Sequence, residues 1–206
     1  VYESVTSSAN SLIDNAKKIV ASGSAKYIIK NDGTLWAMGR KTTGMWGEYD
    51  AKSNYVQVTK DGNENFINVK DIFVSSRGSS CIFMTKDNKI YWAGSTAYIT
   101  LPQIKGDYDA GGDGVVTNYP KEVTSPIINK IREKIKDIQY SSANKGGIQG
   151  NVTLILTEDG KLYTMSNNTN MAGNNSSANN KNGDFTELTI KEGTTVKQML
   201  TQAGLS

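Results

Sequence analysis

The feature that most constrains this chain is a short phrase that occurs three times. It reads NDGTLWAMG at 31–39, KDNKIYWAG at 86–94 and EDGKLYTMS at 158–166. Each copy places a turn-forming pair before apolar and aromatic residues: Asp32-Gly33, Asp87-Asn88 and Asp159-Gly160. Asp-Gly between apolar residues is a strong hairpin signal, because a type I′ turn needs φ > 0 at both central positions. The sequence therefore predicts three hairpins with type I′ turns, recurring as repeated β units.

A second phrase precedes each hairpin and sets the length of the repeat. It reads AKKIV from 16, VKDIF from 69, IKDIQ from 135 and VKQML from 196. Its starts are about 53, 66 and 61 residues apart, in the range in which propeller blades recur. A strand seed closes each unit, as VQV at 56–58, KEV at 121–123 and TEL at 186–188. These phrases divide the chain into units at 21–68, 69–134 and 135–195, with a further unit or terminal strand at 196–206.

This pattern resembles the regulator-of-chromosome-condensation repeat, whose units build β-propellers. The first copy fits best, and it carries Gly23, Asp32-Gly33, Leu35-Trp36, Gly39 and Gly44-Met45-Trp46-Gly47. The second copy lacks the glycine-rich ending, and the third has Ser166 where glycine is expected. The resemblance implies a mainly β fold of repeated antiparallel units over 19–204. The family's namesake acts on a nuclear GTPase and nucleosomes, but no residue of this chain matches those that carry that activity.

Three units fall short of the ~4–8 blades with which propellers close. The chain is then a part of a larger propeller, or it closes in another way, with the hairpins in one sheet packed on a helix. A helix is expected over 1–20, where apolar or small residues recur at steps of three and four, from Val1 and Val5 to Ala16 and Ile19.

The expected N-terminal helix has two interpretations. It is a capping or linker helix, or it is the spine of a filament subunit. An amphipathic helix followed by antiparallel strands is similar to a type IV pilin or pseudopilin ectodomain, although the N-terminal Phe and apolar run of pilins are absent. A second, short amphipathic helix is expected in the segment PIINKIREKIKDI at 126–138.

Composition limits the partners. The net charge of +3 is spread over alternating basic and acidic residues, which disfavours a nucleic-acid partner. No apolar run approaches the ~18 residues that a membrane span needs, so contact with a membrane would require a segment absent from this chain. The single cysteine, Cys81, cannot form an internal disulfide and is expected to be buried. Disulfide-free surface proteins are usual in Gram-positive bacteria, so the single cysteine does not argue against export. An extracellular or cell-surface location is expected.

The chemistry of the chain is poor in catalytic groups. Histidine is absent, which removes the usual general base and every His-containing triad. No catalytic residue and no cofactor is therefore expected, and the chain is predicted not to be an enzyme. The loop GDYDAGGDG places Asp107, Asp109 and Asp113 close together, which suggests a weak calcium site. This loop departs from the EF-hand pattern at Gly111 and Asn118, and the alternative interpretation is a solvated loop.

Binding is expected on loops displayed by the rigid scaffold. Trp46, Asn168 and Asn170 are the candidate interaction residues, whereas Trp36 and Trp92 are expected in the blade core. The sequence thus predicts a non-catalytic, exported structural or protein-binding module that contacts other proteins or assembles with itself. The alternative is the ectodomain of a pilin or pseudopilin, and an enzyme with an unrecognised site is third.

Overall fold

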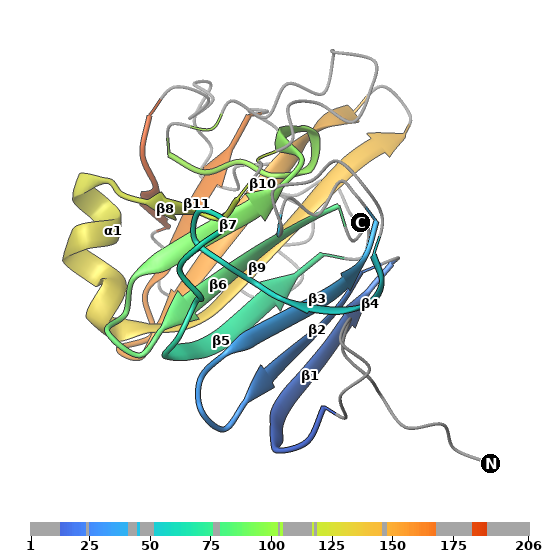
Figure 1. Ribbon diagram of the computed structural model, residues 1–206. Helices are drawn as coiled ribbons and strands as arrows, with labels where there is room; N and C mark the ends of the chain where they lie inside the picture. Colours follow the sequence, from blue (N-terminus) through green and yellow to red (C-terminus); the bar gives the residue numbers. More distant parts are fainter. Residues whose placement is uncertain are drawn as a thin grey trace.

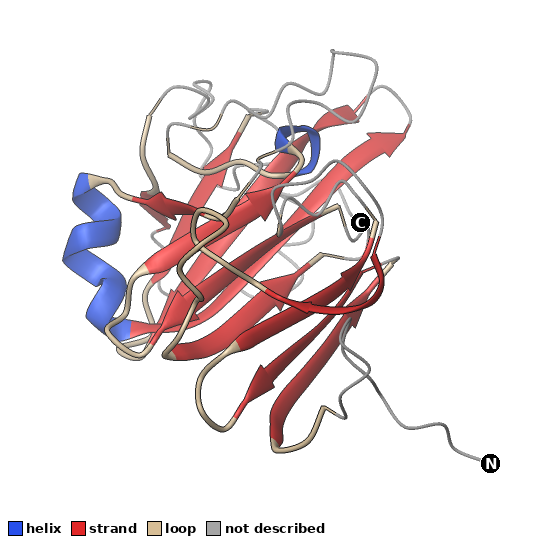
Figure 2. Cartoon of the chain, viewed as in Figure 1, coloured by secondary structure: helices blue, strands red, loops and turns tan. Residues whose placement is uncertain are grey.

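Three four-stranded antiparallel sheets form most of the described chain (Figures 1 and 2). The computed structural model describes residues 13–23, 25–40, 45, 52–75, 79–102, 104, 117, 119–145, 148–167 and 183–188. Among these residues, no helix has the length and apolar character needed to cross a membrane. The expectation of a mainly β fold is confirmed.

Each sheet is a simple meander in which consecutive strands are neighbours, and we call the three sheets blades. Blade 1 contains β1 (Ala16–Ser22), β2 (Ala25–Lys30), β3 (Leu35–Gly39) and β4 (Lys52–Gln57). Blade 2 contains β5 (Val69–Val74), β6 (Ser80–Thr85), β7 (Ile90–Gly94) and β8 (Lys121–Val123). Blade 3 contains β9 (Ile135–Lys145), β10 (Ile148–Thr157), β11 (Leu162–Ser166) and β12 (Thr186–Leu188). The recurring phrases from 16, 69 and 135 are therefore first strands, and the closing seeds contribute to fourth strands. The phrase from 196 lies outside the described residues.

The three hairpins are built alike, but their turns are not type I′. The N–H of Gly33 donates to the carbonyl of Lys30 at 2.9 Å, and the N–H of Lys30 donates to the carbonyl of Thr34 at 3.0 Å. The same two bonds recur one and two repeats later. In each turn only the third residue has a positive φ, at 84° for Gly33, 59° for Asn88 and 78° for Gly160. The type I′ prediction is therefore wrong, and each turn has the three-residue form with one left-handed residue in a bulge.

A β-bulge recurs at the start of every first strand. The register with the second strand shifts between Ala16 and Lys18 in blade 1 and between Val69 and Asp71 in blade 2. In blade 3 it shifts opposite the step from Ile135 to Asp137. The residue passed over is a lysine each time. Because the bulge adds one residue, side chains three apart can share a face, as buried Ile135 and Ile138 do.

The expected N-terminal helix is wrong for Ala16–Val20, which belong to β1. The bulge gives the physical reason, because it spaces same-face residues by three and so imitates a helical pattern. Residues 1–12 lie outside the described part of the chain. Over the described residues the pilin interpretation therefore loses the helix on which it rested.

The expected helix at 126–138 is present in its first part only. Helix α1 spans Pro126–Ile131, and a 3-10 turn, η4, follows at Arg132–Lys134 before β9 begins. A second 3-10 turn, η2, spans Thr96–Tyr98. Helix α1 lies beside blade 2 in Figure 1, and its Ile128 and Ile131 are buried in the apolar cluster of blades 2 and 3.

The apolar core lies between the blades. One cluster joins blades 1 and 2, and it includes Tyr27, Ile29, Ile72 and Phe83. The other joins blades 2 and 3, and it includes Ile82, Met84, Trp92, Ile138, Tyr140, Ile155 and Tyr163. Every residue of the central strand β6 is buried, because blade 2 is covered on both faces. Each blade thus stabilises its neighbour by removing apolar surface from water.

Candidate protein-interaction surface

One end of the three sheets gathers the hairpin turns and the residues that lead into the first strands. The N–H of Asn31 donates to the carbonyl of Asn15 at 2.9 Å, and that of Lys86 donates to the carbonyl of Asn68 at 2.7 Å. In blade 3 the N–H of Glu158 donates to the carbonyl of Lys134 at 2.7 Å. These equivalent bonds fix each turn to the entry of a blade. We call the surface formed by 14–15, 30–34, 59–68, 86–89, 132–134 and 158–161 the turn face.

Each hairpin turn presents one aspartate on the turn face. Asp32, Asp87 and Asp159 are all exposed. Asp32 accepts from the N–H of Thr34 at 2.9 Å and from its hydroxyl at 2.7 Å. Asp159 accepts from the hydroxyl of Thr157 at 2.6 Å. These carboxylates are therefore held in a defined geometry instead of swinging freely.

The same kind of bond lowers the pKa of all three carboxyl groups below the ordinary value. The N–H of Thr34 is the main cause for Asp32, and the hydroxyl groups of Thr85 and Thr157 are the main causes for Asp87 and Asp159. A hydrogen bond donated to the ionised form favours that form. The turn face therefore carries three ordered negative charges at neutral pH.

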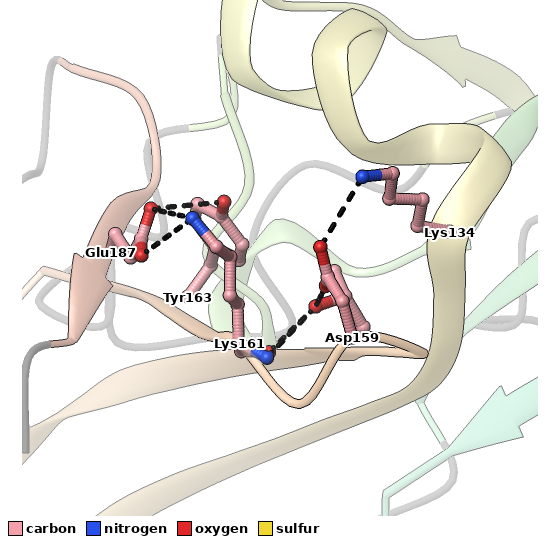
Figure 3. A network of polar contacts seen from close by, with 6 residues as sticks. Lys134, Asp159, Lys161, Tyr163 and Glu187 are labelled. Atoms are coloured by element: carbon pink, nitrogen blue, oxygen red, sulfur yellow. Dashed lines mark hydrogen bonds and ion pairs between the residues drawn. The ribbon is translucent and has the colours of Figure 1, made fainter.

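Charges also connect the turn of blade 3 to its fourth strand (Figure 3). The Nζ of Lys161 lies 3.1 Å from Glu187, and the hydroxyl of Tyr163 donates to the same carboxylate at 3.1 Å. The Nζ of Lys134 reaches Asp159 at 3.3 Å from the segment before β9. The hydrogen bond from Lys161 is the main cause of a lowered pKa at Glu187. The network fastens the short strand β12 to β11.

The network has counterparts in the other blades. In blade 2, Lys89 lies 3.9 Å from Glu122, which pairs in register with Tyr91 as Glu187 pairs with Tyr163. In blade 1 the register pair is Trp36 with Gln57. The indole N–H of Trp36 donates to the hydroxyl of Thr34 at 3.0 Å. The charged contact between the turn and the fourth strand thus recurs in blades 2 and 3, whereas blade 1 shares only the register pair.

Most of the candidate residues chosen from sequence fall outside the described part of the chain. They are Asp107, Asp109, Asp113, Trp46, Asn168 and Asn170. The calcium and interaction hypotheses for them stay predictions. Trp92 is buried in the cluster of blades 2 and 3, as expected for a residue of the blade core, whereas Trp36 is half-buried and belongs to neither apolar cluster. Among the described residues, no group of three or more His, Cys, Asp or Glu side chains could hold a metal ion.

Cys81 is buried between blades 1 and 2, as the sequence predicted. Burial raises the pKa of its thiol to about 12, so the reactive thiolate is scarce at neutral pH. Its Sγ lies 3.9 Å from the Sδ of Met45. This cysteine packs as a small apolar side chain.

The carboxylates of the turn face were missed as a site by sequence reasoning. Their signal was present, because an aspartate stands in every copy of the repeated phrase. On sequence alone, each of these aspartates counts only as a turn-forming residue. What the sequence did not reveal is that the turns of all three blades share one end of the molecule.

Comparison with known proteins rests on solved structures, because no family model and no curated protein matches this sequence. Yeast RCC1 (Prp20) bound to Kap60 has 12% identity and a TM-score of 0.58, and the match covers 87% of this chain and 38% of that one. Prp20p from Saccharomyces cerevisiae has 13% identity and a TM-score of 0.57 over 87% of this chain and 39% of that one. Human WBSCR16 has 16% identity and a TM-score of 0.52 over 74% of this chain and 33% of that one.

These matches cover between 33% and 39% of the length of the three proteins. At such low identity the likeness concerns the fold alone. The order of strands, the repeated turns and the cores between sheets agree with that likeness. The described part of the chain therefore has the fold of β-propeller blades of the regulator-of-chromosome-condensation type.

Proposed function

We propose that this chain is a non-catalytic protein-binding module, exported to the surface of a bacterial cell, and that its turn face is the binding surface. The observation that carries the proposal is the repetition of an ordered, ionised carboxylate at the same place in three hairpins. Two of the similar structures support a protein as partner. One is yeast RCC1 bound to Kap60, and the other is Prp20p, a protein with binding properties to Gsp1p and histones.

The three hairpin carboxylates suit a partner that presents lysine and arginine side chains at matching positions, although the turn face as a whole carries seven basic and eight acidic residues. The groups of Thr34 that donate to Asp32 are neutral and leave its charge in place, although the charge of Lys30 also acts on this carboxylate. Asp159 is shared with Lys134, which leaves it a weaker attractor. Exposed charges of this kind set the association rate and the orientation of a partner more than they set affinity. Binding is therefore expected to weaken as salt increases.

The test compares the wild-type chain with the triple variant Asp32→Asn, Asp87→Asn and Asp159→Asn. Asparagine keeps an acceptor for the threonine bonds but removes the charge. The matched control is Glu122→Gln, which neutralises an exposed carboxylate on the fourth strand of blade 2. Each protein is immobilised, and proteins extracted from the cell surface are crosslinked to it, identified and titrated at low and high salt.

We expect the wild type and the control to bind the same partner and the triple variant to bind it more weakly. Each exposed ion pair contributes about 0.2–1 kcal/mol, so the loss of three corresponds to about a 3- to 150-fold weaker affinity. Equal binding by the triple variant would exclude the turn face as the binding surface. Export is tested separately by antibody labelling of intact cells, and label found only after permeabilisation would contradict it.

A further inference from the structure

Four buried polar residues from all three blades lie at the ends of the first strands, on the side opposite to the turn face. Blade 2 contributes Ser75, which follows β5, and Ser80, which begins β6. Blade 1 contributes Tyr27 of β2, and blade 3 contributes Tyr140 of β9. The exposed fraction is 1% for Tyr27, 6% for Tyr140, 7% for Ser75 and 0% for Ser80. We call these four residues the junction.

Two backbone carbonyls of blade 2 bind the neighbouring blades at the junction. The hydroxyl of Tyr140 donates to the carbonyl of Ser80 at 2.6 Å, and the hydroxyl of Ser22 donates to the carbonyl of Ser75. Blade 2 is therefore bonded to blade 3 at one end of the connection between β5 and β6, and to blade 1 at the other end. Both bonds use carbonyl oxygens, so they do not satisfy the two serine hydroxyls.

Three buried hydroxyl groups of the junction have no hydrogen-bond partner among the described residues. They are the hydroxyls of Tyr27, Ser75 and Ser80. Burying a hydroxyl without a partner is costly, and the large majority of buried polar side chains in native proteins are bonded to protein or to ordered water. Three such groups in one place therefore indicate a partner that the protein itself does not supply.

The pKa values of the two tyrosines indicate that these groups are close to one another. Burial raises the pKa of the Tyr140 hydroxyl, and the hydrogen-bonding groups of Ser80 and Ser75 beside it offset part of that rise. Burial also raises the pKa of Tyr27, and the charges of Cys81 and Tyr140 raise it further. Because Cys81 directly follows Ser80 in β6, the hydroxyl of Tyr27 faces the same part of blade 2 as that of Tyr140.

The surroundings of the junction restrict what its partner can be. Tyr27 belongs to the apolar cluster of blades 1 and 2, and Tyr140 belongs to that of blades 2 and 3. Among the described residues no charged side chain is buried, so an ion at the junction would have no counter-charge. The partner must therefore be small and neutral, and it must be able to donate and accept hydrogen bonds.

We propose that the hydroxyls of Tyr27, Ser75 and Ser80 hold ordered water at the junction of the three blades. Water is neutral and both donates and accepts, and a buried water molecule typically makes about three hydrogen bonds to groups that are otherwise unsatisfied. It joins the hydroxyl of blade 1 to the hydroxyls of blade 2, beside the direct bond from blade 3. The junction thus adds a polar connection between blades whose other contacts are largely apolar.

The test counts long-lived water molecules in the whole chain by oxygen-17 magnetic relaxation dispersion. The triple variant Tyr27→Phe, Ser75→Ala and Ser80→Ala removes the three hydroxyls and no other heavy atom. The matched control is Tyr163→Phe, because the hydroxyl of Tyr163 already donates to Glu187. Circular dichroism confirms that each variant is folded. A high-resolution crystal structure of the wild type provides a second measurement that needs no variant.

We expect the wild type and the Tyr163→Phe variant to hold the same number of long-lived water molecules, and the triple variant to hold at least one fewer. In the crystal, a water oxygen should lie about 2.5–3.2 Å from at least two of the three hydroxyl oxygens. Equal counts in all three proteins would overturn the proposal, because the hydroxyls would then bond directly to one another. A crystal structure with no water at that distance would overturn it too, and it decides the question if the triple variant does not fold.

Discussion

The contact between the turn of blade 1 and the entry to blade 2 can be measured with a matched pair of substitutions, Gly33→Ala and Gly160→Ala. Both glycines have a left-handed backbone, with φ at 84° and 78°. They differ in their surroundings, because an added Cβ at Gly33 would lie 2.7 Å and 2.9 Å from the backbone N and Cα of Asn68. At Gly160 the space is open.

Gly160→Ala lowers the free energy of unfolding only through the backbone conformation that the new residue must adopt. A residue with a Cβ in the left-handed region loses about 1–2 kcal/mol. The lower entropy of the unfolded chain returns about 0.4–1 kcal/mol of that loss. The net destabilisation is then about 0–1.6 kcal/mol.

Gly33→Ala has the same conformational cost, and a steric cost is added to it. Backbone atoms of Asn68 cannot turn aside as a flexible side chain could, so the two blades must separate locally. Overpacking of this kind costs about 1–3 kcal/mol. The total loss is then about 1–4.6 kcal/mol, and the excess over Gly160→Ala is the contribution of the contact between blades.

The assay is urea unfolding followed by far-ultraviolet circular dichroism, with the m value compared between variants. An unchanged m value shows that the loss belongs to the native state. Equal free energies of unfolding for the two variants would refute the reasoning, because the turn of blade 1 would then not press on blade 2.

Tyr140, Cys81 and the hairpin carboxylates each support a further prediction. Tyr140→Phe leaves the buried carbonyl of Ser80 without its donor, so the free energy of unfolding should fall by about 1–3 kcal/mol in the same urea assay; an unchanged value would mean that water replaces the hydroxyl. Cys81, with its raised pKa, should not react with a thiol reagent at pH 8 until urea unfolds the chain, and fast labelling of the native chain would contradict its burial. The three hairpin carboxylates have a lowered pKa, so the stability they add is complete above their ordinary pKa of 3.8 and is lost as the pH falls through the folded values. Their triple asparagine variant should therefore lose less stability than the wild type as the pH is lowered past 3.8, as urea titrations at each pH would show, and an equal loss would contradict it.

The hairpins and the repeat could be predicted from sequence because both depend on local chemistry. Asp32-Gly33 and its two counterparts stand where the chain reverses. The turn type was missed because Asp-Gly suits both a type I′ turn and a three-residue turn with one left-handed residue. Only the backbone angles separate the two forms.

The helix over 1–20 was a misinterpretation over its last residues, and the cause is specific. Ala16 and Ile19 are three apart, as on a helix, but the bulge at Lys17 produces the same spacing in a strand. The other copies of this phrase, VKDIF and IKDIQ, could have corrected the helix prediction. Copies of one repeat are expected to adopt the same structure, and these two stand before hairpins as strands do. Contacts such as that of Lys18 with Asp71 join residues far apart in sequence, so no local pattern could reveal them.

The central position of blade 2 has a consequence for how the molecule opens. Among the described residues, it alone of the three sheets has an apolar cluster on both faces, and its strand β6 is buried throughout. In a linear array of this type, stability is nearly a sum of each unit and its contacts with neighbours. The outer blades can therefore fray one at a time while the middle one stays closed, and amide protons of β6 should exchange with solvent only when the entire array comes apart.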